Sequence, residues 1–472
     1  MTAPASKVPL TLWGQAAILL LGGFASMFTS TVGTVTLDTV AHQLGAPLAT
    51  AQWTVSGYLI AMATIVPASG WAAKRCGGKP IWLVAITLFG IFSAFCAVST
   101  SVEMLIFSRV LLGLTAGLLV PVGQMMIAVA AGPHRMGRLM SIASIPLVLA
   151  PVLGSTAGSL LTRAYGWPWL FWINVPFAAV GLVAGLRWLK PAMKTSTGPL
   201  DVLGLALVLV GLPAIVYGVE QWAAGGTGGL ESTVVGVVLL ITFAVHEVRT
   251  RHPLLNLRLF LDRAFSSTVV VMFGMGMALF GGMIVLPVYF LQVRHEDLVT
   301  TGLLTAPTAV GTVLALPLVG RLTDRIGGAR IVVAGIVVTI AGTLPLAFIG
   351  TTDSYLWLAA VQLVRGLGIG MTTIPAIATG LARLPADQVP DATPVFNMIQ
   401  RIGSSFGIAI LTALLSSRLA DGPHTAAAAT GAIGYVHGWV VAATAVVLIP
   451  ALLMLRPGIS LQHKEAPERT KL

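Results

Sequence analysis

Long apolar runs recur along the whole chain, and short segments that carry most of the charged residues separate them. Each run is close to the ~20 residues that an α-helix needs to cross the hydrocarbon core of a bilayer. A chain of 472 residues that is 56% hydrophobic and only 9% charged cannot be a soluble protein, because water would not solvate its surface. The sequence therefore predicts an all-α integral membrane protein that lies in the lipid bilayer.

The apolar runs predict fourteen membrane-spanning helices. Their bounds are approximately 12–37, 50–72, 80–99, 104–130, 139–162, 169–189, 199–219, 231–248, 265–292, 301–320, 330–350, 355–381, 393–417 and 434–455. We expect the first run to be retained as a helix, because no small-residue cleavage site follows it at a suitable place.

The distribution of basic residues predicts the orientation of the chain. With the N-terminus placed inside, 21 of the 27 Lys and Arg residues fall in cytoplasmic segments and three fall in outer loops. This excess satisfies the positive-inside rule and predicts a multi-pass protein of the cytoplasmic membrane with both termini in the cytoplasm. The remaining three basic residues, Arg109, Arg365 and Arg401, lie within predicted spans.

An arginine inside a spanning helix costs about 2.5–3.5 kcal/mol on insertion scales. A guanidinium at such a position is expected to face a partner or a watery cavity, and this makes Arg109 a candidate transport-site residue. The alternative for Arg109 is a side chain that extends to the outer end of its helix, since it lies early in the run 104–130.

An internal repeat divides the chain. The segment GWAAKRCGGK at 70–79 matches GRLTDRIGGAR at 320–330, and each copy precedes a glycine-rich helix that an arginine opens, Arg109 or Arg365. Two parallel six-helix halves around a central site describe the major facilitator architecture. The predicted divisions are a first bundle 1–189, a two-helix insertion with a cytoplasmic linker 190–264, a second bundle 265–456 and a cytoplasmic tail 457–472.

Several motifs resemble the fourteen-span drug:proton antiporter family of the major facilitator superfamily. They are the 320–330 loop, the Arg109 helix, APVLGSTAG at 150–158, WPWLFWINVP at 167–176, PLLNLRLF at 253–260, and Asn397 and Arg401 with their following glycines. The resemblance implies a secondary active transporter that exports amphipathic organic compounds or drugs by alternating access, coupled to protons. It also implies a monomer whose partners are the substrate, protons and lipid.

Proton coupling requires a carboxylate that alternates between a proton and a cation. Members of this family usually carry an Asp in the middle of the first helix, where this chain has Thr29. Asp38 lies nine residues further on, about 13 Å along a helix axis. The candidates for proton coupling are therefore Asp38 and Arg109. The alternative for Asp38 is an outer-end residue that faces water, in which case transport is either uncoupled or driven by a substrate that carries its own charge.

The repeated loops are candidate gates. Asp324 is expected at a helix N-terminus, where a carboxylate is stabilised, with Arg325 or Arg330 as an ion partner. The alternative is a simple turn with a helix cap. The first copy has Lys74 at the position of Asp324, so the first contact is expected to be absent or rewired. Small residues and prolines of the fifth span suggest a rocking surface. The gating candidates are Asp324, Arg325, Gly320, Gly327, Pro151, Gly154 and Gly158.

A central cavity with three arginines and no central carboxylate would be electropositive, which favours neutral or anionic substrates. Asn397, Gln400 and Arg401 share one helix face and supply a polar stripe. For each apolar candidate the alternative is ordinary helix packing. The cavity candidates are Thr31, Thr34, Tyr58, Arg109, Gln124, Phe280, Met283, Arg365, Phe396, Asn397, Gln400 and Arg401, with Trp53 beside them.

Other functions are disfavoured. The sequence has no nucleophile–base pair or metal cluster, and no GxxxxGK[ST] loop, so we expect neither an enzyme, nor a cofactor or metal site, nor an ATP-driven pump. Basic residues are scattered and form no patch for nucleic acid. Two alternatives to a multidrug exporter stay open: a dedicated exporter of one endogenous neutral or anionic metabolite, and an uncoupled facilitator.

Overall fold

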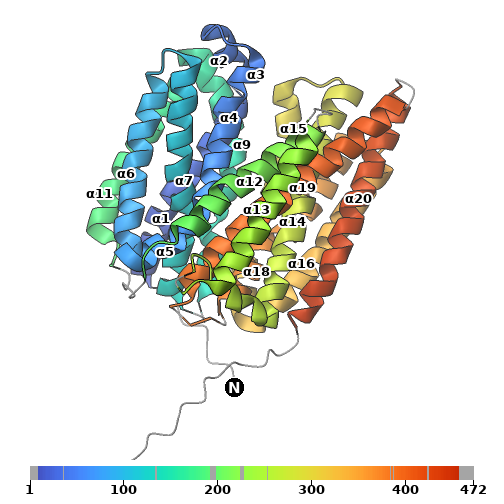
Figure 1. Cartoon of the computed structure of the whole chain (residues 1–472). Coiled ribbons are helices and arrows are strands. Elements are labelled where there is room, and N and C mark those ends of the chain that lie inside the picture. The colour runs from blue at the N-terminus through green and yellow to red at the C-terminus, as the bar shows by residue number, and fades with distance from the viewer. Residues whose placement is uncertain are drawn as a thin grey trace, which may run out of the picture.

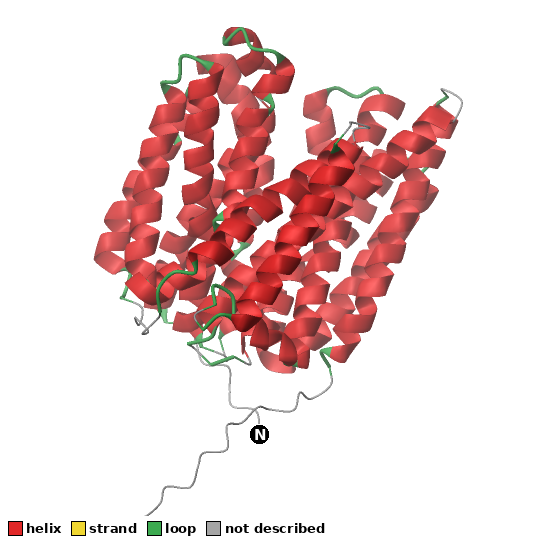
Figure 2. Cartoon of the chain, in the orientation of Figure 1, coloured by secondary structure: helices red, strands yellow, loops and turns green. Residues whose placement is uncertain are grey.

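The computed structural model describes residues 9–455 except 36, 133–134, 192–197, 224–227, 252, 383, 386 and 422–424. Within this part the chain forms helices, turns and loops and no strand (Figure 2). The prediction of an all-helical fold is confirmed for these residues. The side chains of Thr34, Asp38 and Phe280 lie outside the described part, so their predicted roles stay predictions.

The first bundle occupies the left of Figure 1, in blue to blue-green. Helices α1, α4 and α6 pack on α7, and α1 also packs on α9 and α11. The elements up to α11 are α1 (Leu10–Val35), α2 (Leu37–Gln43), α3 (Leu48–Ala51), α4 (Trp53–Thr64), α5 (Val66–Cys76), α6 (Gly78–Ala97), α7 (Val102–Ala131), α8 (Met136–Ala143), α9 (Ile145–Tyr165), α10 (Trp169–Trp172) and α11 (Asn174–Trp188).

Prolines interrupt two predicted spans of this bundle. The span 50–72 is divided into α4 and α5, which meet at 47° beside Pro67. The span 139–162 is divided into α8 and α9 at Ser144, just before Pro146. A proline lacks an N–H and clashes with the preceding turn, so it favours the start of a new helix, although Pro121 and Pro151 lie inside α7 and α9.

The second bundle occupies the right of Figure 1, and α14 packs on α19 and α20 while α17 packs on α15 and α16. Its elements are α14 (Arg263–Val288), the π-helix η2 (Tyr289–Val293), α15 (Leu298–Ile326), α16 (Gly328–Thr343), the 3-10 helix η3 (Leu344–Phe348), α17 (Tyr355–Gly370), α18 (Thr373–Ala382), α19 (Val389–Asp421) and α20 (Ala426–Leu453). Two inserted helices lie before it, followed by a short one: α12 (Val202–Ala223), α13 (Gly229–Arg249) and η1 (Leu257–Leu261).

The two bundles diverge toward the end that carries α2 and α3, and they meet at the opposite end (Figure 1). At this joined end α5 packs on α19, α8 packs on α15 and α18, and α9 packs on α15. The repeat is visible in the backbone: Gly77 and Gly327, each between two helices, have φ angles of 91° and 88°. Only glycine adopts such angles without strain.

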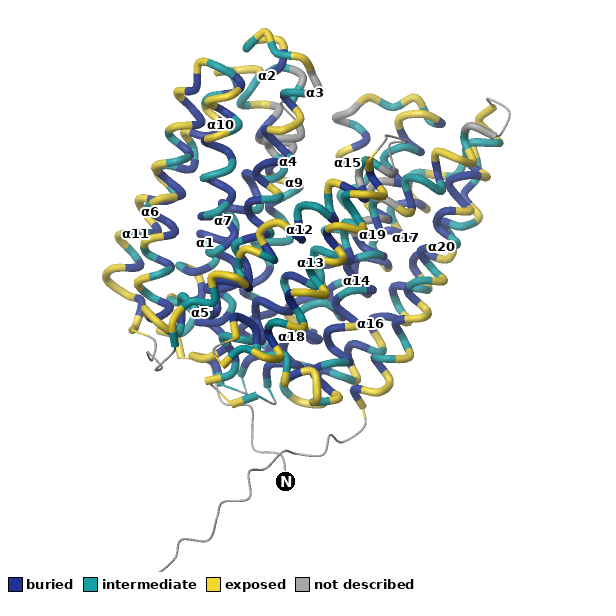
Figure 3. The backbone as a smooth tube through the Cα atoms, in the orientation of Figure 1, coloured by how far each residue is buried: buried dark blue, intermediate teal, exposed yellow. Residues whose placement is uncertain are grey.

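Burial follows the expected pattern of a membrane protein. Exposed residues line the outer faces of both bundles and of α13, while buried residues lie between helices (Figure 3). Many exposed side chains are large and apolar, such as Val245 on α13 and Val446 on α20. Hydrocarbon can cover such faces at no cost, whereas water cannot.

The predicted number of spans is only partly supported. Among the described residues, eleven helices are long and apolar enough to cross a membrane, or twelve with the bent α4–α5 pair. The other two predicted spans fall on the shorter apolar helices Met136–Pro151 and Arg263–Leu279. Fourteen spans therefore stays a prediction.

Candidate functional site

Arg109 lies in the interior of the first bundle, with only 1% of its surface exposed. Its Nε donates to the carbonyl oxygen of Thr54 at 2.7 Å and its Nη1 to that of Thr29 at 3.3 Å. The guanidinium carbon lies 4.5 Å from the ring centroid of Tyr58 and 5.6 Å from that of Phe171. Backbone carbonyl dipoles and aromatic faces thus stabilise the guanidinium in the place of a carboxylate.

A network of polar side chains continues from this arginine. Tyr58 donates to the carbonyl of Ser26 at 2.8 Å. The Nδ2 of Asn174 donates to the hydroxyls of Thr29 at 2.9 Å and Ser93 at 3.0 Å. Sequence reasoning missed Ser26, Ser93 and Asn174 as members of this network, although Asn174 lies in the 167–176 motif. The buried Nη2 of Arg109 and Oδ1 of Asn174 have no hydrogen-bond partner in the described part of the chain.

Arg365 occupies a similar place in the second bundle and is 3% exposed. A Cβ atom at Gly282 would lie 2.3 Å from its Nη2, so the missing side chain of α14 leaves room for the guanidinium. His437 of α20, which is fully buried, lies within electrostatic range of Arg365. Sequence reasoning missed His437, because a lone histidine in an apolar helix carries no distinctive pattern.

The expectation that Arg109 and Arg365 line a central cavity is wrong for this structure. Both side chains are enclosed by their own bundle, and neither lines any of the cavities described below. The alternative for Arg109, extension to the helix end, is excluded by its burial as well. For Arg109 the physical reason is that backbone carbonyls and ring faces inside the bundle stabilise the guanidinium without water.

One contact joins predicted site residues across the two bundles. Asn397 of α19 donates through Nδ2 to Oε1 of Gln124 on α7 at 3.0 Å. Gln400 and Arg401, on the following turn of α19, remain partly exposed, and Arg401 lies within electrostatic range of Tyr58. The polar stripe of α19 therefore lies at the interface between the bundles, as a transport site requires.

Two of three cavities lie at the interface between the bundles, and the apolar one lies within the first bundle. A small enclosed one of about 20 Å³ is lined by Gln124 and Ser144 and by the apolar side chain of Ile374 from α18. A wholly apolar crevice of about 320 Å³ lies between α1, α8, α9 and α11. The third, of about 250 Å³, surrounds Asp324 at the joined end. Of the twelve predicted cavity residues, Gln124 alone lines one of these three cavities.

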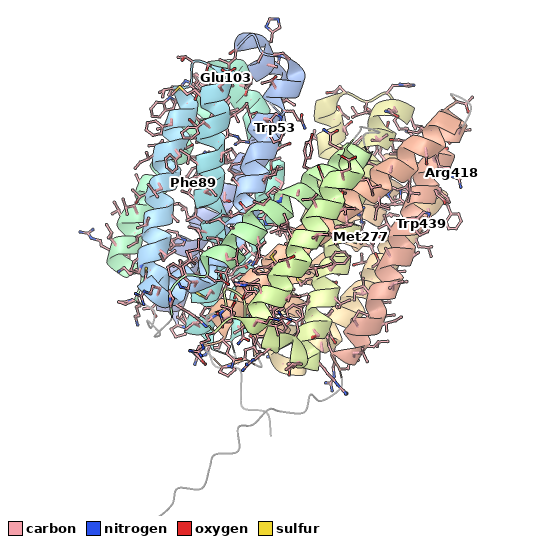
Figure 4. All side chains as sticks on the ribbon, viewed as in Figure 1. Trp53, Phe89, Glu103, Met277, Arg418 and Trp439 are labelled. Atoms are coloured by element: carbon pink, nitrogen blue, oxygen red, sulfur yellow. The ribbon has the colours of Figure 1, made fainter. Side chains whose placement is uncertain are left out.

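The remaining cavity candidates are dispersed. Phe396 is fully buried and packs on Phe265, with ring centroids 5.0 Å apart, so it belongs to the core of the second bundle. Met283 is 56% exposed, and Thr31 is half-buried and donates to the carbonyl of its own helix at Met27. Trp53 lies on the side of α4 toward the second bundle, as Figure 4 shows.

Asp324 makes a contact between the bundles that we call the Asp324 junction. Its Oδ1 accepts from the N–H of Gly137 at 2.9 Å and its Oδ2 from the N–H of Arg138 at 3.1 Å. These amides are in the first turn of α8, where unsatisfied N–H groups and the helix dipole favour an anion. The carboxylate thus lies at a helix N-terminus, and this helix, α8, belongs to the other bundle.

Lys74 makes the second contact, the Lys74 junction. Its Nζ lies 2.6 Å from Oδ2 of Asp391, in the first turn of α19, and the two side chains are 18% and 14% exposed. A lysine would be repelled by a helix N-terminus, but Asp391 supplies the anion there and Lys74 pairs with it. The first loop is therefore rewired, as the reversed charge at position 74 indicated.

The two junctions occupy equivalent places in the repeat. A Cβ at Gly320 would lie 3.1 Å from the carbonyl oxygen of Gly137, and one at Gly70 would lie 2.4 Å from that of Pro390. Each glycine precedes its charged residue by one helical turn. Asp391 consequently corresponds to Arg138, but the contacts differ, because Lys74 pairs with the side chain of Asp391 and Asp324 accepts from the backbone N–H groups of Gly137 and Arg138.

Within the described ranges of the chain, the other gating candidates form no hydrogen bond or ion pair between the two bundles. Gly154 of α9 faces the carbonyl of Phe28 on α1, so it serves packing within the first bundle and not between bundles, which corrects the rocking-surface expectation for this residue. Pro151 lies inside α9, Gly327 forms the turn before α16, and Arg325 is exposed. Gly158 is buried in α9.

The sequence model of the Major Facilitator Superfamily matches residues 19–408. The multidrug resistance protein B homolog of Mycobacterium tuberculosis (strain ATCC 25618 / H37Rv) is 33% identical over 417 residues, which cover 87% of this chain and 77% of that protein. The lincomycin resistance protein LmrB of Bacillus subtilis (strain 168) is 29% identical over 406 residues, 84% of each chain. The crystal structure of the human organic anion transporter MFSD10 has the same fold, with a TM-score of 0.66 at 15% identity over 95% of this chain and all of that one. The chain therefore belongs to the Major Facilitator Superfamily and is similar in sequence to relatives named for multidrug resistance and lincomycin resistance.

Proposed function

We propose that this protein exports amphipathic organic compounds across the cytoplasmic membrane by alternating access, coupled to protons. The observation that carries the proposal is the pair of junctions, which join two bundles at one end while the bundles diverge at the other. A transporter needs such a reversible closure. The names of the relatives supply the substrate class, drugs.

The positive-inside distribution of basic residues places the joined end in the cytoplasm, together with both termini. On this assignment the junctions close the cytoplasmic side and the structure faces outward. We propose the division into bundles 1–189 and 265–456, the insertion 190–264 and the tail 457–472, with Gly320, Asp324 and Lys74 in gating roles.

The interface stripe of α19 is the proposed substrate-contact surface. Asn397, Gln400 and Arg401 offer amides and one cation, and Gln124 meets them from α7. The set contains no carboxylate, which favours neutral or anionic compounds over dications. Arg109 and Arg365 act from inside the bundles, where they hold helix pairs together and set the local potential.

Proton coupling is assigned to Asp38 with Arg109 as a remote partner, on the sequence argument given above. Replacement of Asp38 by Asn removes the titrating group and keeps the size of the side chain. We expect Asp38→Asn to transport without dependence on an imposed pH gradient in proteoliposomes. Unchanged pH dependence would assign the proton route to another residue.

Resistance profiling tests the export function. Cells that overproduce the chain are expected to tolerate several chemically diverse amphipathic drugs, and Asn397→Ala with Gln124→Ala is expected to narrow or abolish that tolerance. Tolerance to none of the drugs, with flux of one endogenous neutral or anionic metabolite in proteoliposomes, would establish the dedicated-exporter alternative. The absence of a carboxylate from the α19 stripe is what keeps that second function open.

A further inference from the structure

The inserted helices α12 and α13 have very different surroundings. Only 17% of the most apolar 18-residue window of α13 is buried, and this helix packs on α12 and at one end on η1. Helix α12 lies inside it and packs on helices of both bundles, α4 and α5 of the first and α19 of the second. In Figure 1 α12 crosses obliquely in front of the space between the bundles. The hairpin formed by α12 and α13 thus covers one lateral side of the interface between the two bundles.

The contact of α12 with the second bundle is buried and interdigitated. Ile215 and Val219, one turn apart, are each 4% exposed and form an apolar cluster with Phe406 of α19. Gly236 of α13 lies where a Cβ would be 2.6 Å from Cγ1 of Ile215, so the hairpin packs tightly behind this cluster. Separation of α12 from α19 would create cavities, which are costly.

The contact of α12 with the first bundle is shallow by comparison. Tyr217 stacks on Trp53 of α4 with ring centroids 6.1 Å apart and an interplanar angle of 22°. Both rings stay partly exposed, 36% for Tyr217 and 45% for Trp53. Two nearly parallel, partly exposed rings can slide past each other with little loss of buried area, because their contact is flat.

The other side of the molecule is built differently. By the repeat, the pair of helices equivalent to α4 and α19 is α15 and α9. These two pack directly on each other, as α5 and α19 do at the joined end, whereas beside α4 the inserted helix α12 packs on both α4 and α19. The insertion therefore breaks the symmetry of the two bundles, and covers one lateral side.

We propose that the α12–α13 hairpin is a one-sided wall of the transport route, which moves with α19 and slides along α4. The Trp53–Tyr217 stack is the contact that yields when the bundles change their relative tilt. This inference rests on the alternating access proposed above. The hairpin then covers the α4–α19 side of the interface against lipid in both states.

Tryptophan quenching of bimane measures the sliding contact without any transport assay. The background carries Cys76→Ser and Cys96→Ala, and bimane is attached at Tyr217→Cys, where Trp53 quenches it. We expect the label to become about two-fold brighter when Lys74→Ala and Asp324→Ala release the joined end and shift the population of states. Trp53→Phe supplies the unquenched reference.

A label on the outer face of the hairpin is the matched control. Bimane at Ile241→Cys, a position 59% exposed on α13, is expected to keep the same intensity in all variants. Equal quenching at position 217 with and without the junctions would overturn the proposal, and so would no dependence on Trp53. Because this readout needs no substrate, it stays decisive even if no drug is exported.

Reversible cross-linking separates the two contacts of α12. A short cleavable thiol linker between Trp53→Cys and Tyr217→Cys is expected to stop flux, and reductant is expected to restore it. The same linker between Val219→Cys and Phe406→Cys is expected to leave flux unchanged, because both residues move together. Flux that survives the first linkage, or stops with the second, would contradict the assignment of which bundle the hairpin follows. Absence of flux in the Cys76→Ser, Cys96→Ala parent, before these cysteine pairs are introduced, would instead count against the proposed function.

Discussion

The Lys74 junction allows the most direct test of the closure at the joined end. The perturbation is Lys74→Ala, which leaves Asp391 without the ammonium that lies 2.6 Å away. A fully exposed ion pair contributes at most about 1 kcal/mol, whereas removal of one partner of a buried pair costs about 3–5 kcal/mol. At side-chain exposures of 18% and 14% the pair lies between these limits.

We therefore expect Lys74→Ala to destabilise the joined state by roughly 2 kcal/mol, which is about 30-fold in its equilibrium with the separated state. Asp391→Ala should shift the equilibrium in the same direction. The double variant should shift it less than the sum of the two single variants, because the single changes remove the same interaction. Lys74→Asp with Asp391→Lys should restore part of the loss.

Pulsed electron resonance between two spin labels measures this shift. One label is placed on the native Cys76, which is exposed at the end of α5, and the other on Arg330→Cys of α16, in a Cys96→Ala background. Lys79→Ala is the matched control, since Lys79 lies at the same end but donates to the carbonyls of Leu186 and Leu189 within the first bundle. Equal distance distributions for Lys74→Ala and Lys79→Ala would refute the reasoning.

Three further predictions concern other parts of the site. Asp324→Ala removes the acceptor of two helix N–H groups, so it should destabilise the joined state relative to the separated state by about 1–2 kcal/mol. The effect should be larger than that of Asp324→Asn in the same spin-label experiment. Arg109→Ala should abolish efflux while the protein still inserts and elutes as a monodisperse peak. Arg109→Lys should not restore efflux, because an ammonium cannot donate and stack as a guanidinium does. Normal efflux by either variant would show that Arg109 is not part of the mechanism. Gly366→Ala should lower the melting temperature, because its Cβ would lie 2.0 Å from the carbonyl oxygen of Thr308, whereas Gly302→Ala, with no atom within 4 Å, should not.

The length of the apolar runs determined the helical membrane fold, because hydrocarbon permits only helices or closed barrels. The repeat at 70–79 and 320–330 likewise determined the two-bundle plan, and its glycines reappear as turns with positive φ at Gly77 and Gly327. Interruptions within spans were harder to predict. Pro146 was recognised as a source of bending, but the separation of α8 from α9 at Ser144 depends on neighbouring helices.

The candidate site was predicted less well, and the arginines show why. The cost of placing a charge in a spanning helix indicated that Arg109 and Arg365 needed a partner or a watery cavity, and the matching arginine in the second half of the chain favoured the cavity. The structure supplies Arg109 with carbonyls of Thr29 and Thr54 and the ring of Tyr58 instead. Such partners exist in every sequence, so only the packing of helices shows which ones reach a given guanidinium.

The sequence by itself determined which long apolar segments need lipid around them and where the two halves correspond, since these depend on composition and spacing alone. The tertiary structure decided which charges meet. Lys74 and Asp391 are 317 positions apart, and Asp324 reaches amides 187 and 186 positions away. No local pattern encodes such pairs, because they form only when the two bundles are pressed together at one end.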